Sequence, residues 1–189
     1  MGLLGGSFNP AHEGHRHIAE LALARLGLNQ VWLMVSPGNP LKPVIGMASF
    51  SERLAGAAAI GDGRRVLATS IEAALGTRYT ADTLRILRRR FPRARFVWIM
   101  GADILTQLPR WRRWREIVHN LPFVVLPRPG FSLSALAGQA ARRLRHARRP
   151  AHEAPVLSRL RSGWVFLPAP GVSASATAIR QARHQGVVS

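Results

Sequence analysis

Glycines and histidines near the N-terminus carry the clearest chemical signal in this chain. Gly5 and Gly6 end a short apolar run, and His12 and His15 follow where a helix is expected to begin, close to Gly14. Glycine lets the backbone approach an anion closely, and the free amides and positive dipole end of a first helical turn favour phosphate. Histidines three residues apart across this turn can donate hydrogen bonds to one group. The segment therefore predicts a phosphate-binding site.

The single lysine is a second candidate for phosphate binding. Lys42 lies in the proline-rich stretch 37–43, and every other one of the 27 basic residues is arginine. A compact ammonium charge on a loop after the apolar run 31–35 could reach a phosphate. Chance retention of one lysine explains the observation equally well, so both interpretations stay open.

The net charge of +18 raises the alternative of nucleic-acid binding. The near-exclusive use of arginine, spread along the chain, indicates a coding bias instead. The densest group is predicted to share one helix, 133–149, with the apolar stripe Leu133, Leu136, Ala140 and Leu144, and it consists of Arg142, Arg143, Arg145, Arg148 and Arg149. A solvated helix face explains this group, and we expect no nucleic-acid partner.

Length and composition predict one soluble domain spanning residues 1–189. The chain is 47% apolar, which excludes a disordered protein, and 189 residues suffice for one core. No apolar stretch approaches the roughly 18 residues of a membrane span, and no signal-peptide pattern opens the chain. The absence of cysteine excludes disulfides and thiolate metal sites. We expect a cytoplasmic location without a membrane partner and leave the oligomeric state open.

Apolar runs alternate with helical patterns along the chain. Strands are expected at the first residues and at 31–35, 65–71, 96–100, 123–126 and 165–167, and helices at 14–26, 49–60, 80–91 and 175–184. Ser49 and Glu52 have capping-box spacing, Thr80 is the expected N-cap of its helix, and Phe91 is expected to point inward. This order predicts an α/β fold with a doubly wound, mainly parallel, Rossmann-like sheet. Ligands bind such sheets at the carboxyl ends of the strands.

That rule brings distant polar and aromatic residues to one edge of the sheet. They are His12, His15, Lys42, Asp82, Asp103 and Trp111. Asp82 could equally complement the dipole of its helix, and Asp103 could be an N-cap. Trp114 is expected in the core, whereas Trp111, between two arginines, is the better platform for a ligand ring.

Several motifs resemble known ones. His12 to His15 is similar to the His-x-Gly-His signature of the nucleotidyltransferase superfamily. Residues 79–84 resemble the Tyr-Thr-x-Asp-Thr-Leu segment of bacterial nicotinate-nucleotide adenylyltransferases, and residues 101–103 with Trp111 resemble their Gly-Ala-Asp…Trp pattern. Residues 175–180 resemble their C-terminal Ser-Ser-Thr-x-Ile-Arg element. The chain is thus identified as resembling this family, which joins nicotinate mononucleotide to the AMP part of ATP.

The resemblance implies roles for individual residues. Catalysis falls to His12, His15 and Lys42. ATP binding falls to Gly5, Gly6, Ser7, Phe8, Gly101, Asp103, Ser175, Thr177, Ile179 and Arg180, with a helical portion at about 170–189 completing this site. Nicotinate mononucleotide binding falls to Asn9, Tyr79, Thr80, Asp82, Thr83 and Trp111.

The chain departs from the family pattern at two positions and has a short first strand. Ala176 replaces a serine and removes one hydroxyl donor, and Arg112 stands where the family often has tyrosine. A related adenylyltransferase such as phosphopantetheine adenylyltransferase, and a nucleotide sensor without turnover, remain alternatives. The first of these lacks the Tyr-Thr-x-Asp-Thr segment paired with the tryptophan.

The chemistry of the implied reaction agrees with the residue types. A phosphate monoester has a second pKa of about 6, so the attacking oxygen is ionised at neutral pH and needs no general base. The reaction needs alignment and neutralisation of phosphate charge. We expect Mg²⁺ to be carried by the ATP phosphates and water, with no metal site built by the protein.

Overall fold

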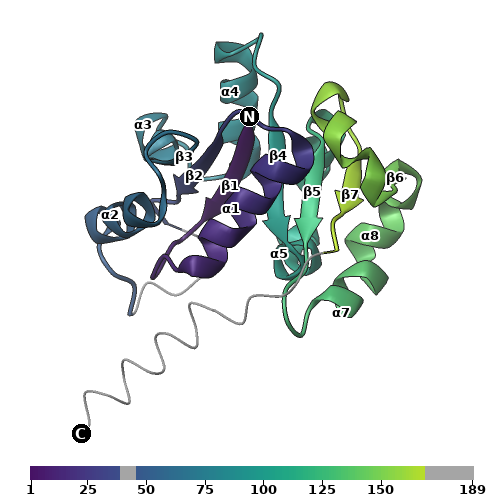
Figure 1. Ribbon diagram of the computed structural model, residues 1–189, viewed down its shortest axis with the longest axis horizontal. Coiled ribbons are helices and arrows are strands. Elements are labelled where there is room, and N and C mark those ends of the chain that lie inside the picture. Colours follow the sequence, from purple (N-terminus) through teal and green to yellow (C-terminus); the bar gives the residue numbers. More distant parts are fainter. Residues whose placement is uncertain (39–45, 169–189) are drawn as a thin grey trace, which may run out of the picture.

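A computed structural model describes residues 1–38 and 46–168 of the chain. Seven parallel strands form one sheet in the order β3-β2-β1-β4-β5-β7-β6. The strands are β1 Gly2–Gly6, β2 Val31–Val35, β3 Val66–Thr69, β4 Val97–Gly101, β5 Phe123–Leu126, β6 Arg148–Arg149 and β7 Trp164–Phe166. The chain runs outward from β1 to β3 and then returns to β4 on the other side of β1 (Figure 1). This reversal opens a crevice beyond the carboxyl ends of β1 and β4.

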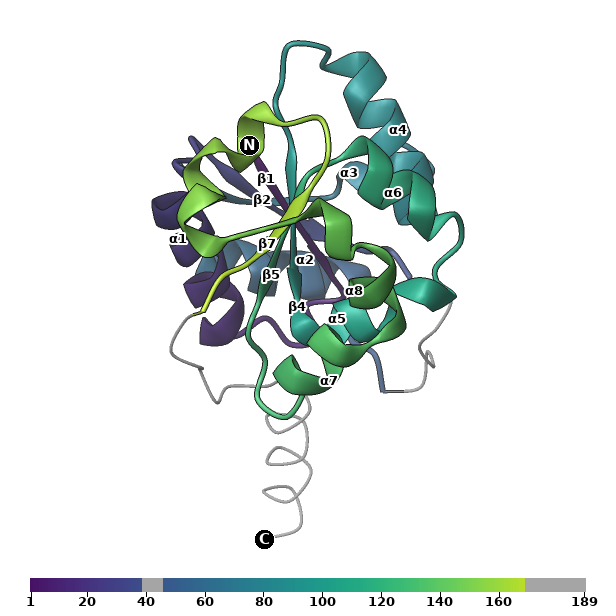
Figure 2. The ribbon, with the colours of Figure 1, turned by 90° about the vertical axis from the view of Figure 1, so that its right-hand side faces the viewer.

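Helices cover both faces of the sheet. They are α1 Glu13–Leu26, α2 Phe50–Ile60, α3 Ile71–Ala74, α4 Thr80–Arg90, α5 Ala102–Gln107, α6 Trp114–Asn120, α7 Ser132–Ala137 and α8 Gln139–Arg143, with 3₁₀ segments at Leu108–Arg110, Arg145–Ala147 and Ala151–Arg159. One apolar cluster packs α1, α2 and the last 3₁₀ segment against one face of the sheet. A second cluster packs the helices from α4 through α8 against the other face. Figure 2 shows the strands between α1 on one side and α4 and α6 on the other. The predicted doubly wound fold is therefore confirmed.

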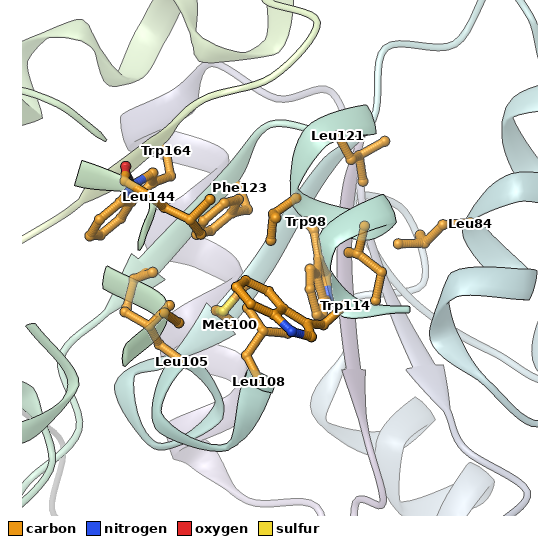
Figure 3. Packing of buried hydrophobic residues seen from close by; sticks show 14 of the residues in the cluster. Leu84, Trp98, Met100, Leu105, Leu108, Trp114, Leu121, Phe123, Leu144 and Trp164 are labelled. Atoms are coloured by element: carbon orange, nitrogen blue, oxygen red, sulfur yellow. Dashed lines mark hydrogen bonds between the residues drawn. The ribbon is translucent and has the colours of Figure 1, made fainter. Parts of the chain in front are cut away.

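Large aromatic side chains fill the second cluster (Figure 3). The rings of Phe123 and Trp164 stack with their planes 3° apart, and the indole N–H of Trp164 donates to the carbonyl oxygen of Leu144 at 2.9 Å. Trp98 and Trp114 are buried beside them, as the sequence predicted for Trp114. A buried indole is stable only if its N–H has a partner, so this bond fixes β7 against the segment after α8.

Most expected elements lie where the sequence placed them. β2 and β5 have the predicted bounds, and Ser49 caps α2 in a capping box with Glu52. β3 ends at Thr69, before the predicted end at residue 71, because α3 begins at Ile71. β1 extends through both glycines of the N-terminal turn, so it is longer than the apolar residues suggested.

Two helix predictions were wrong in detail. Tyr79, not Thr80, precedes the first turn of α4, which has no side-chain cap, and Phe91 is 38% exposed. The arginine-rich helix expected at 133–149 is broken at Gly138, whose extended backbone (φ −73°, ψ 169°) ends α7 and starts α8. Leu133 is 86% exposed, so it does not belong to an inward stripe. The described residues contain no helix long and apolar enough to cross a membrane.

The capping box of α2 is a test of the local structure. The Ser49 hydroxyl accepts from the Glu52 amide at 3.2 Å, and Ser49→Ala leaves that amide without a protein partner. We expect a loss of about 1 kcal/mol in the free energy of unfolding, measured by urea denaturation. Ser51→Ala is the control. Ser51 is the exposed second residue of α2, and its substitution should change stability by no more than about 0.5 kcal/mol. Equal effects of both changes would contradict a capping role.

Candidate active site

A cavity of about 410 Å³ opens at the carboxyl edge of the sheet. It extends from the turn after β1 to the segment around the first turn of α4 and the loop before α6. The predicted site residues that line it are Gly5, Gly6, Ser7, Tyr79, Thr80, Asp103 and Trp111. The fold thus gathers the glycine turn, the start of the 79–84 segment and the 101–103 segment with Trp111 around one space, whereas His12 and His15 do not line it. Sequence analysis missed other lining residues, namely Glu72, Arg78, Gln107, Arg110 and Arg112.

His12 and His15 are oriented by the start of α1. His12 is the N-cap of this helix, and its Nδ1 accepts from the Gly14 amide at 3.1 Å. Nδ1 of His15 accepts from the His12 amide at 3.3 Å, and the ring centroids lie 3.9 Å apart. A ring nitrogen that accepts carries no proton, so each neutral imidazole holds its proton on Nε2. The helix start therefore selects the tautomer of both rings.

The Nε2 atom of His12 is buried and has no hydrogen-bond partner among the described residues. Burial, and then the positive charge of Arg128, lower the pKa of His12 to about 4. His12 is therefore neutral at pH 7 and offers one unused N–H at the end of β1. An unsatisfied buried donor is costly, and a ligand oxygen is its natural partner.

Arg128 is a site residue that sequence analysis missed. It follows β5, its amide donates to the Ser132 hydroxyl at 3.2 Å, and its Nε lies 3.9 Å from Oδ1 of Asp103. The rule that placed Asp103 just after β4 applies equally to a residue just after β5, so this signal was present in the sequence. With His12, Arg128 makes this part of the edge attractive to an anion.

Arg53, on α2, connects the segments that directly follow β1 and β2. Its guanidinium donates to carbonyl oxygens of Ser7 at 2.8 Å, Ser36 at 2.7 Å and Ala48 at 3.1 Å. The side chain is 3% exposed, burial lowers its pKa, and it belongs to none of the ion pairs found between described residues. Arginine stays charged in such settings. Its bonds fix the glycine turn while its charge adds to the positive potential there.

Thr83 is a correction to the predicted binding residues. Its side chain is fully buried, and its hydroxyl lies 2.7 Å from that of Thr77 and 3.3 Å from Oε1 of Glu72. This hydroxyl is thus engaged within the protein and is not exposed to a ligand. Glu72 itself lines the cavity, and burial raises the pKa of its carboxyl. The cluster attaches α4 to the segment after β3.

Asp82 is also engaged within the protein. Its Oδ1 accepts from Arg85 at 2.9 Å and from Arg113, and it does not line the cavity. Arg113 has a left-handed backbone (φ 54°) and precedes α6. The expected ligand contact of Asp82 is therefore replaced by ion pairs that hold the first turn of α4 against the loop carrying Trp111.

The aromatic end of the cavity is formed by Tyr79 and Trp111. The Trp111 ring packs against Trp98 at 5.5 Å between centroids, and its indole N–H has no partner among the described residues. The guanidinium of Arg112 lies 4.8 Å from the centroid of the Tyr79 ring. Trp111 is partly buried while Trp114 lies in the core, as their different predicted roles required.

Within residues 1–38 and 46–168, the predicted site residues that do not line the cavity are His12, His15, Asp82 and Thr83, described above, together with Phe8, Asn9 and Gly101. Phe8 is 1% exposed, with its ring 4.8 Å from that of His15. The side chain of Asn9 accepts from the Ala48 amide at 3.1 Å. A Cβ at Gly101 would lie 2.4 Å from Oδ1 of Asp103, so a larger residue at position 101 would force the carboxylate of Asp103 to move. The remaining predicted residues lie outside the described part of the chain: Lys42, Ser175, Thr177, Ile179 and Arg180, with the C-terminal portion at 170–189.

Fold and cavity together define a doubly wound α/β domain whose pocket lies at the first strand–helix turn. Residues 3–182 match a family model described as cytidylyltransferase-like. A protein of Gluconacetobacter diazotrophicus named "Probable nicotinate-nucleotide adenylyltransferase" is 59% identical, with 95% of this chain and 84% of the relative covered. A protein of Gluconobacter oxydans with the same name is 58% identical, with 96% of this chain and 93% of the relative covered. The chain belongs to the nicotinate-nucleotide adenylyltransferase family.

A solved structure supports the fold. The nicotinic acid mononucleotide adenylyltransferase of Plasmodium falciparum, complexed with NaAD, superposes with a TM-score of 0.70 over 95% of this chain and 82% of its own. Its sequence identity is 16%, so the similarity speaks for the architecture alone.

The state of His12 is directly measurable. We expect long-range ¹H–¹⁵N correlation spectra of the free protein to show the Nε2–H tautomer and a titration midpoint near 4. Since this pKa lies below the unfolded value of about 6.5, the unfolded chain binds the proton first as pH falls. His12 should therefore reduce stability as pH falls from about 6.5 to 4, and no further below. A midpoint above 6 would contradict the burial of this ring.

The Thr83 cluster predicts a structural phenotype. Thr83→Val keeps the shape and removes the hydroxyl bonded to Thr77 and Glu72, so we expect a loss of about 1–3 kcal/mol in the free energy of unfolding. Thr106→Val is the control, because this exposed hydroxyl bonds only to the carbonyl oxygen of Ala102 within its own helix. Unchanged stability together with a raised KM for the mononucleotide would instead indicate a ligand contact of Thr83.

Proposed function

We propose that the chain transfers AMP from ATP to nicotinate mononucleotide, forming nicotinate adenine dinucleotide and pyrophosphate. The observation that carries the proposal is the cavity itself, which joins a glycine turn at the β1–α1 junction to an aromatic end at Tyr79 and Trp111. Such a space accommodates phosphate at one end and a ring at the other. Membership in the family supplies the identity of the reaction.

The reaction is a direct displacement at the α-phosphorus of ATP. A phosphate oxygen of nicotinate mononucleotide forms the new P–O bond, and the bond from the α-phosphorus to the oxygen of the departing pyrophosphate breaks. The attacking oxygen is already ionised near neutral pH, so no side chain has to remove a proton. The protein then contributes alignment and stabilisation of the charge that moves to the leaving group.

His12 and His15 are the proposed donors to these phosphates. The Nε2–H of His12 has no partner among the described residues, and a pKa of about 4 keeps the ring neutral near pH 7, so this group can donate there. His15 is assigned to the α-phosphate or its bridging oxygen. Arg128 and the buried Arg53 add positive charge at the same edge, and fixed charges of this kind need no reorganisation during the reaction.

Further phosphate contacts are proposed for residues beyond the described ones. Lys42 and Arg180 would neutralise phosphate charge, and Ser175 and Thr177 would donate hydrogen bonds. Mg²⁺ is proposed to arrive with ATP, held by phosphate oxygens and water, because the described residues offer no group of three carboxylate or imidazole side chains for it. Its part is to neutralise phosphate charge. A chain that uses ATP in this way fits the cytoplasmic location predicted above.

The mononucleotide is proposed to bind at the aromatic end. The pyridine ring would pack against Trp111, with its carboxylate near the backbone amides of the first turn of α4. No side chain caps this helix start, so its amides can donate hydrogen bonds to a negatively charged group. The acid form of the mononucleotide should therefore be preferred to the amide form.

A pyrophosphate-release assay with ATP and several phosphate acceptors tests the proposed function. We expect activity with nicotinate mononucleotide and less with nicotinamide mononucleotide. Turnover of pantetheine phosphate without turnover of nicotinate mononucleotide would overturn the proposal in favour of a related adenylyltransferase. ATP binding without turnover of any acceptor would indicate a nucleotide sensor.

His15→Ala tests the role of the histidine pair. Because the imidazole acts on charge that grows in the transition state, kcat should fall about 10²–10³-fold with a smaller change in the KM for ATP. Circular dichroism would confirm that the variant folds, since its ring also accepts from the His12 amide. His119→Ala, at an exposed position on α6, is the matched control and should leave kcat unchanged. Near-normal turnover of folded His15→Ala would make the motif structural.

A further inference from the structure

The aromatic end of the cavity is rich in arginine. Arg78, Arg110 and Arg112 all line it. Within residues 1–38 and 46–168, none of their guanidinium groups forms an ion pair or a side-chain hydrogen bond. This differs from Arg113, the neighbour of Arg112, whose guanidinium is paired with Asp82. The cavity therefore has cationic groups whose charge no described side chain neutralises.

Arg112 differs from the other two because an aromatic ring holds it. Its guanidinium carbon lies 4.8 Å from the centroid of the Tyr79 ring, within the range of a cation–π contact. Among the described residues no hydrogen bond uses the N–H groups of this guanidinium, so they remain available. Those N–H groups match the two oxygens of a carboxylate.

The surrounding charges favour an anion at this place. The described acidic side chains that line the cavity are Glu72 and Asp103. Burial raises the pKa of Glu72, although hydrogen bonds from Thr83 and Ser36 act in the opposite direction, and Asp103 faces Arg128 at 3.9 Å. Neither neutralises Arg112. A ring stacked between Tyr79 and Trp111 would bring a carboxylate on its edge close to this guanidinium.

We propose that Arg112 determines specificity for the acid form of the mononucleotide by binding the carboxylate of its pyridine ring. The side chain would add a full positive charge to the partial charges of the backbone amides at the start of α4. This inference rests on the proposed function, since it assigns one more contact within the same site. Arg112 lies in the loop before α6, whereas the backbone amides proposed above lie in the first turn of α4.

The test compares two neighbouring arginines. Arg112→Gln removes the charge and keeps a polar chain, while Arg115→Gln is the control, because Arg115 stacks at 6.0 Å on Trp114 and does not line the cavity. Steady-state kcat/KM would be measured with nicotinate and with nicotinamide mononucleotide at saturating ATP. Calorimetric titration with each mononucleotide would measure binding independently of turnover.

We expect Arg112→Gln to lower kcat/KM and affinity for the acid form about tenfold, and to change those for the amide form less than twofold. The value is at the lower end for a charge-assisted hydrogen bond because Arg112 is exposed to water. Arg112→Lys should restore part of the loss, and Arg115→Gln should have none. An unchanged acid-to-amide ratio in an active Arg112→Gln protein would overturn the role of Arg112 alone. A wild-type protein inactive with both mononucleotides would instead overturn the proposed function.

Discussion

The hydrogen bond from the Gly14 amide to Nδ1 of His12 couples the folding of α1 to the chemistry of the site. The same bond that caps the helix decides which nitrogen of the ring carries the proton, and it leaves the buried Nε2–H without a hydrogen-bond partner among the described residues. Burial keeps the ring neutral, so the donor does not depend on protonation near pH 7. A change in the start of α1 would therefore alter both stability and the tautomer of this ring.

The remaining parts of the site depend on groups that tie neighbouring segments together. Arg53 donates to four carbonyl oxygens, one after β1, two after β2 and one before α2, and β1 and β2 lie side by side in the sheet. Asp82 is paired with Arg113, and Glu72 is bonded to Thr83, so α4 is attached on two sides. Hydrogen bonds and ion pairs within the protein make the segments around the cavity rigid. This rigidity preserves the alignment that an in-line displacement needs.

The cavity separates two kinds of positive charge. At the glycine turn the cations are oriented by hydrogen bonds or burial, as with Arg53 and Arg128. At the aromatic end the arginines are exposed, and Arg112 is held mainly by the ring of Tyr79. A dinucleotide product has phosphates in its middle and a charged ring at one end, which corresponds to this distribution.

Local patterns in the sequence determined the elements and the identity of the principal residues. Capping by Ser49, the strands at 31–35 and 123–126 and the glycine-histidine turn follow from interactions within a few residues, so they were predictable. Tertiary structure alone decided which side chains remain for a ligand. Thr83 and Asp82 carry suitable chemistry in the sequence, but Glu72 and Arg113, distant in the chain, already bond to them. Arg112 reaches the cavity from the loop before α6, and a long-range contact of this kind leaves no periodic signal in the sequence.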